Sequence, residues 1–147
     1  MNSELIEHII EFEGLELKPY QCTSNKTTIG VGRNLSDNGI TYSEAMTLLQ
    51  NDIDTVVAEL KQRYEWFEEL PPRAKLVLVD LGFNLGVPTL ANFKKMLADI
   101  QDGLWESAAI NLLDSRYAKQ VGRRATYNAS MLETAGTDHS LPTTPAI

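Results

Sequence analysis

Residues 13–32 read EGLELKPYQCTSNKTTIGVG, and this stretch decides how the chain is organised. Near its end, Ile29 and Val31 alternate with small residues, a pattern that is typical of a β-strand. The three residues at 24–26, Ser-Asn-Lys, come just before that strand and favour a turn. The sequence therefore predicts a β-hairpin over Leu17–Gly32.

Helical patterns lie on both sides of this hairpin. Residues 3–12 place apolar side chains at helical spacing, and Gly14 follows as a stop signal. After the hairpin, Thr41 and Glu44 have the spacing of a capping box, in which each satisfies a backbone N–H of the other. We expect this box to open a helix that continues to about Arg63.

The rest of the chain has a helical pattern throughout. Pro72 suits the first turn of a helix that is apolar nearly all round, as a helix in the middle of a core would be. Gly86 and Pro88 are expected to end it. Three further helices are predicted at 92–101, 104–117 and 123–134. The predicted fold class is α+β and mainly helical.

Composition excludes several classes of protein. The chain has 147 residues, 43% of them hydrophobic, which suits one ordinary domain with a real core. No apolar run is long enough to cross a membrane, and the start lacks a basic leader, so we expect no secretory signal and a cytoplasmic product. The single cysteine, Cys22, excludes internal disulfides and cysteine-cluster zinc sites, and the sequence predicts no metal and no cofactor.

Charge makes nucleic acid a poor partner, because the formal net charge is −7. Positive residues nevertheless gather between 114 and 126, where Arg116, Lys119, Arg123 and Arg124 face one aspartate. The plainest interpretation of this cluster is a solvated helix face.

Glu13 is the first candidate for chemistry. It lies where a predicted helix meets the hairpin, and clefts form where two substructures meet. Taken alone, it is better interpreted as an exposed carboxylate beside Glu11 and Glu16. Eight residues separate Glu13 from Cys22, and five separate Cys22 from Thr28.

This spacing resembles the phage lysozymes of glycoside hydrolase family 24. The resemblance continues at 83–86 (FNLG), 105–112 (WESAAINL) and 115–117 (SRY), and covers about residues 5–135. It implies a two-lobed, lysozyme-like catalytic domain over 1–135. Its expected parts are a hairpin lobe at about 13–40, a connecting helix at about 41–63, a helical lobe at about 71–135 and a flexible tail at 136–147.

The resemblance also implies an activity. Family members are muramidases, which hydrolyse the β-1,4 bond between N-acetylmuramic acid and N-acetylglucosamine in peptidoglycan. As an endolysin, the protein would be a monomer that waits in the host cytoplasm and depends on a holin to reach the peptidoglycan of the periplasm. It would not insert into the membrane.

Three residues match the catalytic positions of the family. Glu13 matches the general acid, and Thr28 matches the threonine that helps to hold the attacking water. Cys22 stands where an aspartate is usual, although some members carry cysteine. A thiol with an ordinary pKa is mostly protonated at neutral pH, so Cys22 could act as a base only where its thiolate is stabilised. Otherwise it could be a small buried apolar residue.

Further positions match by resemblance. Arg124 matches the arginine that pairs with Glu13 in the family. Gly30 and Gly32 fit a bulge or a close backbone approach in the strand, for example to substrate. Cleft positions that contact sugar correspond to Phe83, Phe93 and Asn111, and the two phenylalanines could equally belong to the core.

Two other functions stay open on the sequence. A lytic transglycosylase acts on the same bond and needs no water-activating base, so the missing aspartate would not harm it. A non-catalytic glycan-binding or interaction module could keep the fold without the activity.

Overall fold

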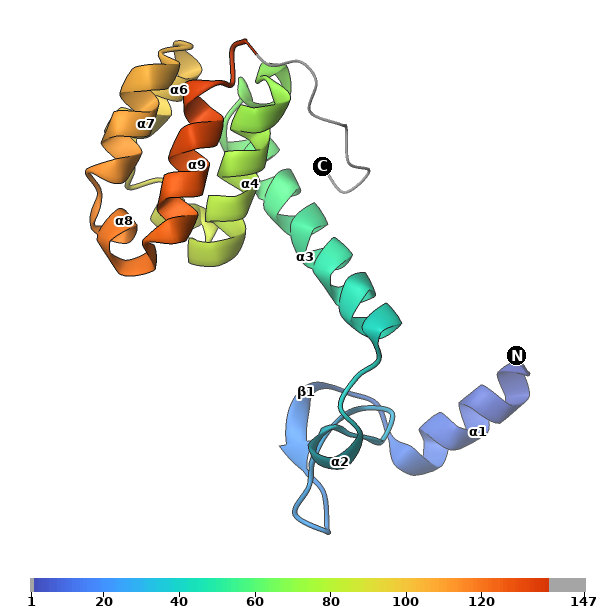
Figure 1. The fold of residues 1–147 in the computed structure, drawn as a ribbon. Coiled ribbons are helices and arrows are strands. Elements are labelled where there is room, and N and C mark those ends of the chain that lie inside the picture. The colour runs from blue at the N-terminus through green and yellow to red at the C-terminus, as the bar shows by residue number, and fades with distance from the viewer. Residues whose placement is uncertain (1, 138–147) are drawn as a thin grey trace. The chain divides into compact units, whose positions relative to one another are not determined.

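A computed structural model describes residues 2–137, which are drawn in colour in Figure 1. The chain divides into two compact units, Met1–Thr47 and Leu48–Ile147, which we call the first and second unit. The described residues are mainly helical with one small three-stranded antiparallel sheet, which confirms the predicted α+β class. The tail predicted at 136–147 lies outside the described residues from position 138 onward. None of the helices in the described part is long and apolar enough to cross a membrane.

The first unit contains the predicted hairpin. Tyr20 pairs with Thr28 across its two strands, and Thr28 pairs with Asn34 on the third strand. Asn25 takes a left-handed backbone conformation in the turn, with φ of 62°. The elements are α1 (Ser3–Glu13), β1 (Glu16–Gln21), β2 (Thr27–Gly30), β3 (Arg33–Asn34) and α2 (Leu35–Asn38).

A capping box begins α3 (Tyr42–Arg63), as predicted. The Thr41 backbone N–H donates to Glu44 Oε1 at 2.8 Å, and the Glu44 N–H donates to Thr41 Oγ1 at 3.1 Å. Glu44 also accepts two hydrogen bonds of 2.8 Å from the guanidinium of Arg33. This hydrogen-bonded guanidinium, followed by the Thr41 N–H, lowers the pKa of Glu44 to about 2. One carboxylate therefore ties the third strand to the start of α3.

The stability of the first unit should depend on pH through Glu44. A carboxyl whose pKa is lowered on folding stabilises the fold above its unfolded pKa of about 4.3, and this contribution is lost as the pH falls from there through about 2. Because the pair is exposed, we expect a shift of only about 1–3 °C in the thermal midpoint. Circular dichroism of wild type and Glu44→Gln should show midpoints that differ at pH 6 and converge near pH 2. Equal midpoints at pH 6 would contradict the stabilising role.

The second unit is built around α4 (Pro72–Leu85), which has six buried residues and is the central helix that the sequence predicts. Helix α4 packs against α5 and α9, and α7 packs against α6 and α9 (Figure 1). Its other helices are η1 (Phe67–Glu69), α5 (Val87–Leu90), α6 (Lys94–Gln101), α7 (Trp105–Leu113), α8 (Arg116–Val121) and α9 (Arg123–Glu133).

The structure confirms where α4 ends, but one helix prediction in this unit is wrong. Helix α4 ends at Leu85 with Gly86 as its C-cap, and Pro88 lies in the first turn of α5, where a missing N–H costs no hydrogen bond. The helix predicted at 104–117 is two helices, because α7 ends before Asp114 and Ser115 caps a new one. The Ser115 hydroxyl accepts a hydrogen bond from the Ala118 N–H at 3.2 Å, a local bond that starts α8.

Candidate active site

The hairpin of the first unit brings Cys22 and Thr28 together. The turn between them closes through the Cys22 N–H, which donates to the Lys26 carbonyl at 3.0 Å. Thr28 is buried, with 4% of its surface exposed, and its hydroxyl donates to the same carbonyl at 3.0 Å. The two residues are therefore held together by hydrogen bonds to one carbonyl of the turn.

The turn also stabilises the thiolate of Cys22. Backbone N–H groups of Lys26 and then Ser24 donate to the sulfur, and together with smaller effects of the Ser24 and Thr28 side chains they lower its pKa to about 7. The single proton of the Thr28 hydroxyl is already donated to the Lys26 carbonyl, so the backbone amides are the main cause of the lowered Cys22 pKa. The thiolate is therefore accessible as a base near neutral pH.

Glu13 is the last residue of α1, and Gly32 lies against its carboxyl. The chain turns at Gly14, whose N–H donates to the Ile10 carbonyl at 2.7 Å. A Cβ atom added to Gly32 would lie 2.5 Å from Oε2 of Glu13, closer than atoms can approach. The predicted close approach at Gly32 thus exists, and the group that approaches is the candidate acid itself.

Gly32→Ala should reduce activity by displacing the Glu13 carboxyl. A misplacement of about 1 Å can cost about a hundredfold in rate, and we expect a loss of about tenfold to a hundredfold. Gly30→Ala is a matched control, since both glycines have φ of 69° but nothing lies within 4 Å of a Cβ at Gly30. Thermal midpoints should fall alike in both variants, whereas the release of reducing ends from peptidoglycan should fall mainly in Gly32→Ala. Equal losses of activity would assign the effect to backbone strain.

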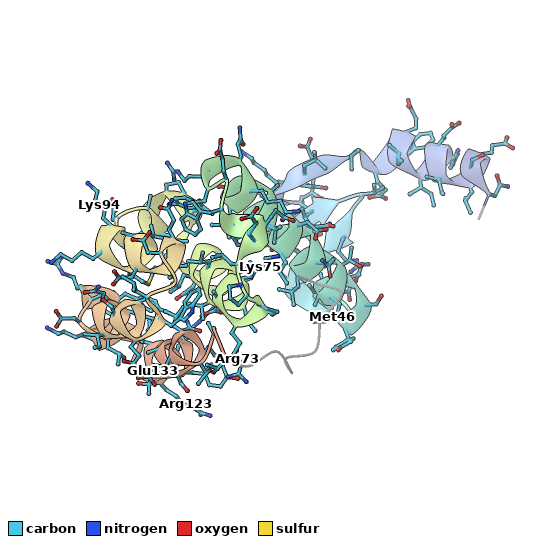
Figure 2. All side chains as sticks on the ribbon, turned by 90° about the horizontal axis from the view of Figure 1, so that it is seen from above. Met46, Arg73, Lys75, Lys94, Arg123 and Glu133 are labelled. Carbon is cyan, nitrogen blue, oxygen red and sulfur yellow. The ribbon has the colours of Figure 1, made fainter. Side chains whose placement is uncertain are left out.

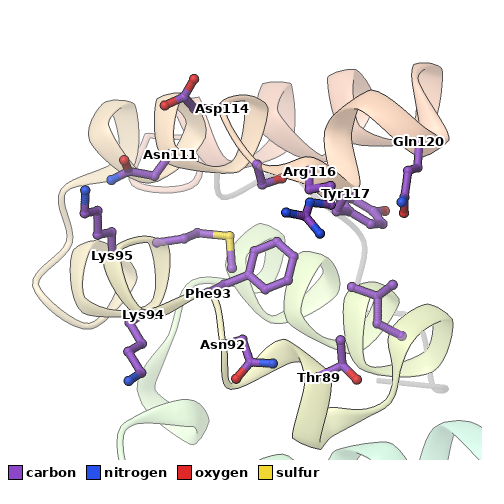
Figure 3. A pocket seen from close by; sticks show the side chains of 13 residues that line it. Thr89, Asn92, Phe93, Lys94, Lys95, Asn111, Asp114, Arg116, Tyr117 and Gln120 are labelled. Carbon is purple, nitrogen blue, oxygen red and sulfur yellow. The ribbon is translucent and has the colours of Figure 1, made fainter.

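In the second unit, Phe93 and Asn111 line one pocket of about 720 Å³. Figure 3 shows the Phe93 ring at the middle of this pocket, with Asn111 on the helix across from it. The ring also packs edge-on against Tyr117, with 6.0 Å between ring centroids, so Phe93 has a core contact as well. The structure therefore brings together two of the three residues that the resemblance assigned to sugar.

Phe83 and Arg124 line a different pocket of about 290 Å³. Arg124 donates to both carboxylate oxygens of Asp80, at 2.6 and 2.9 Å, and Asn128 donates to the same carboxylate at 2.9 Å. Burial opposes the ionisation of Asp80, but these hydrogen bonds outweigh it and lower its pKa. The pairing of Arg124 with Glu13 stays a prediction, because the two residues belong to different units.

The basic residues of the sequence cluster differ in what they contact. Figure 2 shows Arg123 extending away from its helix, whereas Arg124 is bound to Asp80. Arg116 lines the larger pocket instead. All four basic residues are exposed, so the solvated-face interpretation fits the cluster, and Arg124 is in addition paired with Asp80.

Sequence reasoning missed two carboxylates that hold predicted site residues. Asp80 binds Arg124, and Asp99 binds Asn111 at 2.7 Å. Asp80 interrupts the apolar pattern of α4, which is a signal for a buried polar partner. Asp99 gives no such signal, because a single acid on an amphipathic helix resembles any surface residue.

Comparisons with known proteins identify the family of the chain. Residues 10–128 match the family described as phage lysozyme. The chain is 24% identical to "Probable T4-type lysozyme 2" of Dictyostelium discoideum, over 91% of this chain and 96% of the relative. It is 30% identical to an endolysin of Acyrthosiphon pisum secondary endosymbiont phage 1, over 79% and 80%. It is also 28% identical to the pre-baseplate central spike protein Gp5 of Enterobacteria phage T4, over 84% of this chain but only 26% of that protein.

Proposed function

The chain belongs to the phage lysozyme family and is a glycoside hydrolase, and we propose that it hydrolyses the β-1,4 bond between N-acetylmuramic acid and N-acetylglucosamine in peptidoglycan. The observation that carries this proposal is the first unit, where one hairpin supplies a stabilised thiolate beside a buried threonine and a glycine against the Glu13 carboxyl.

Glu13 acts as the general acid. Its protonated carboxyl donates a proton to the glycosidic oxygen as the bond to C1 of the muramic acid breaks, so the departing sugar leaves as a neutral alcohol. Gly32 leaves room for this carboxyl at the end of α1. The positive charge that develops on the sugar ring is then open to attack by water.

Cys22 and Thr28 activate and position the attacking water. The thiolate takes a proton from the attacking water while the oxygen bonds to C1, so the products are two sugars with intact hydroxyl groups. Thr28 positions the water through its hydroxyl oxygen, which keeps acceptor capacity after its proton is used on the Lys26 carbonyl. In this scheme Cys22 takes the place of the usual carboxylate, because the hydrogen bonds of the turn lower the pKa of its thiol to about 7.

The sugar chain is held by the second unit in this proposal. Phe93 and Asn111 supply an aromatic ring and an amide in one pocket, and Phe83 supplies a half-exposed ring in another. Arg124 is a proposed supporting residue of the site, and Asp80 holds its guanidinium.

The biological setting that we propose follows from the family. Residues 1–135 act as one catalytic domain on peptidoglycan glycan strands, as a monomer and without nucleic acid. The protein accumulates in the host cytoplasm, and a holin gives it access to the periplasm, where it lyses the cell. Expression in a Gram-negative host should cause lysis only when a holin is co-expressed.

The bond is tested by the ends that the enzyme creates. Purified Gram-negative peptidoglycan is digested, the fragments are reduced with borohydride, and mass spectrometry identifies the reduced sugar. Muramitol ends are expected, and they should be absent with Glu13→Gln. Glucosaminitol ends would identify a different bond, and binding without any cleavage would indicate the non-catalytic module.

A lytic transglycosylase is the second candidate, favoured by the absence of an aspartate at position 22. Such an enzyme uses the 6-hydroxyl of the muramic acid in place of water and leaves a 1,6-anhydro end, which borohydride does not reduce. The same digestion therefore separates the two reactions.

A further inference from the structure

Asp99, on α6, connects to two residues of α7. Its Oδ2 accepts a hydrogen bond from Asn111 Nδ2 at 2.7 Å and another from Ser107 Oγ at 2.6 Å. Asp99 and Asn111 are both half-buried. Asn111 lines the 720 Å³ pocket, whereas Asp99 is not part of the pocket wall.

The chemistry of a carboxylate fixes which way the Asn111 amide faces. An amide has a donating and an accepting end, but a carboxylate oxygen only accepts. The NH₂ group of Asn111 must therefore face Asp99, and reversal of the amide would place two acceptors against each other. Within residues 2–137, Asn111 Oδ1 receives no hydrogen bond. Its Oδ1 and one remaining N–H are left for a ligand.

We propose that Asp99 is a positioning residue for the substrate, which holds Asn111 in the orientation that recognises an acetamido group. An acetamido group offers one N–H and one C=O, and the free Oδ1 and N–H of Asn111 complement that pair. This inference rests on the proposed function, in which the glycan lies in this pocket. Asp99 itself does not touch the sugar, so its effect passes through Asn111.

The charge of Asp99 alone predicts the opposite change in glycan affinity, so the two effects can be told apart by experiment. Glycan strands carry the carboxylates of muramic acid, so removing a negative charge near the pocket should by itself strengthen binding. A loss of affinity in Asp99→Ala would therefore reflect the lost orientation of Asn111. Asp102→Asn, an exposed acid just after α6, serves as the charge control.

The experiment is calorimetric titration of the Glu13→Gln protein, in which cleavage is blocked, with soluble uncrosslinked glycan strands. Asn111→Ala and Asp99→Ala should each raise Kd about tenfold, the size of one positioned hydrogen bond. The double variant should be no weaker than either single one, because both changes remove the same interaction. Asp99→Asn keeps an acceptor oxygen and should stay within about twofold of the parent.

Ser107→Ala tests whether the effect of Asp99 passes through Asn111 or only through the contact between the two helices. It removes the other hydrogen bond of the Asp99 carboxylate and leaves Asn111 in place. Ser107→Ala should leave Kd unchanged. Its thermal midpoint is measured together with that of Asp99→Ala, so that the two variants can also be compared in stability. The inference would be overturned if the losses of affinity in the double variant were additive. It would also be overturned if Asp99→Ala kept its Kd while Asn111→Ala bound more weakly, or if Ser107→Ala lost as much affinity as Asp99→Ala. Unchanged binding in Asn111→Ala would also overturn it while leaving the muramidase intact. Failure of the proposed function is distinct: wild type would release no muramic acid ends.

Discussion

Glu13→Gln is expected to lose muramidase activity by about a thousandfold, within the range that removal of a general acid costs. Glutamine has the shape of glutamate but cannot give up a proton to the glycosidic oxygen. Because the side chain still fits against Gly32, the affinity for glycan should hardly change. Release of reducing ends measures the rate, and titration with glycan strands measures the affinity.

Glu16→Gln is the matched control for this variant. Glu16 is an exposed carboxylate at the start of β1, paired with Gly30 in the sheet. Its replacement should leave the rate within about twofold of wild type, since a surface substitution away from the chemistry has little effect. Comparable rates for Glu13→Gln and wild type would mean that another group donates the proton.

Cys22 should set the pH dependence of the enzyme. If its thiolate is the base, kcat/KM rises with pH through an apparent pKa near 7, because the protonated thiol below that pH cannot take a proton from water. Cys22→Ser should lower the rate by about a hundredfold and abolish this rising limb of the pH profile. Cys22→Asp should restore activity and move the limb towards the ordinary aspartate pKa of about 3.9. The measurement is the pH profile of reducing-end release for the three proteins.

Alkylation offers an independent check, since the chain has one cysteine. Treatment with iodoacetamide should inactivate wild type, while Cys22→Asp should be resistant because it has no thiol. A Cys22→Ser variant with the wild-type rate and limb would remove Cys22 from the mechanism.

Local signals were sufficient for much of the fold. The Thr41–Glu44 capping box and the stop at Gly14 depend on residues a few positions apart, and both are present. The division at Ser115 was missed because one side-chain hydrogen bond outweighs apolar periodicity that continues past it. Sequence also gives no sign that Glu44 binds Arg33, because that pair depends on how the third strand approaches α3.

The candidate site was predictable in its residues but not in its contacts. Spacing singled out Glu13, Cys22 and Thr28, yet the backbone hydrogen bonds that lower the pKa of Cys22 require the folded turn. Gly32 was expected to allow a close approach, and its neighbour proved to be the Glu13 carboxyl. Asp99 was invisible because its partners lie on the next helix, at positions 107 and 111.

The most direct test of a hydrolytic muramidase is digestion of peptidoglycan in water labelled with oxygen-18, followed by mass spectrometry of the fragments. Attack by water predicts that each new muramic acid end carries one labelled oxygen at C1. Fragments made in ordinary water and then held in labelled water correct for slow exchange at the reducing end. Unlabelled ends, lighter by one water, would contradict the account, since they mean that the sugar's own hydroxyl was the nucleophile.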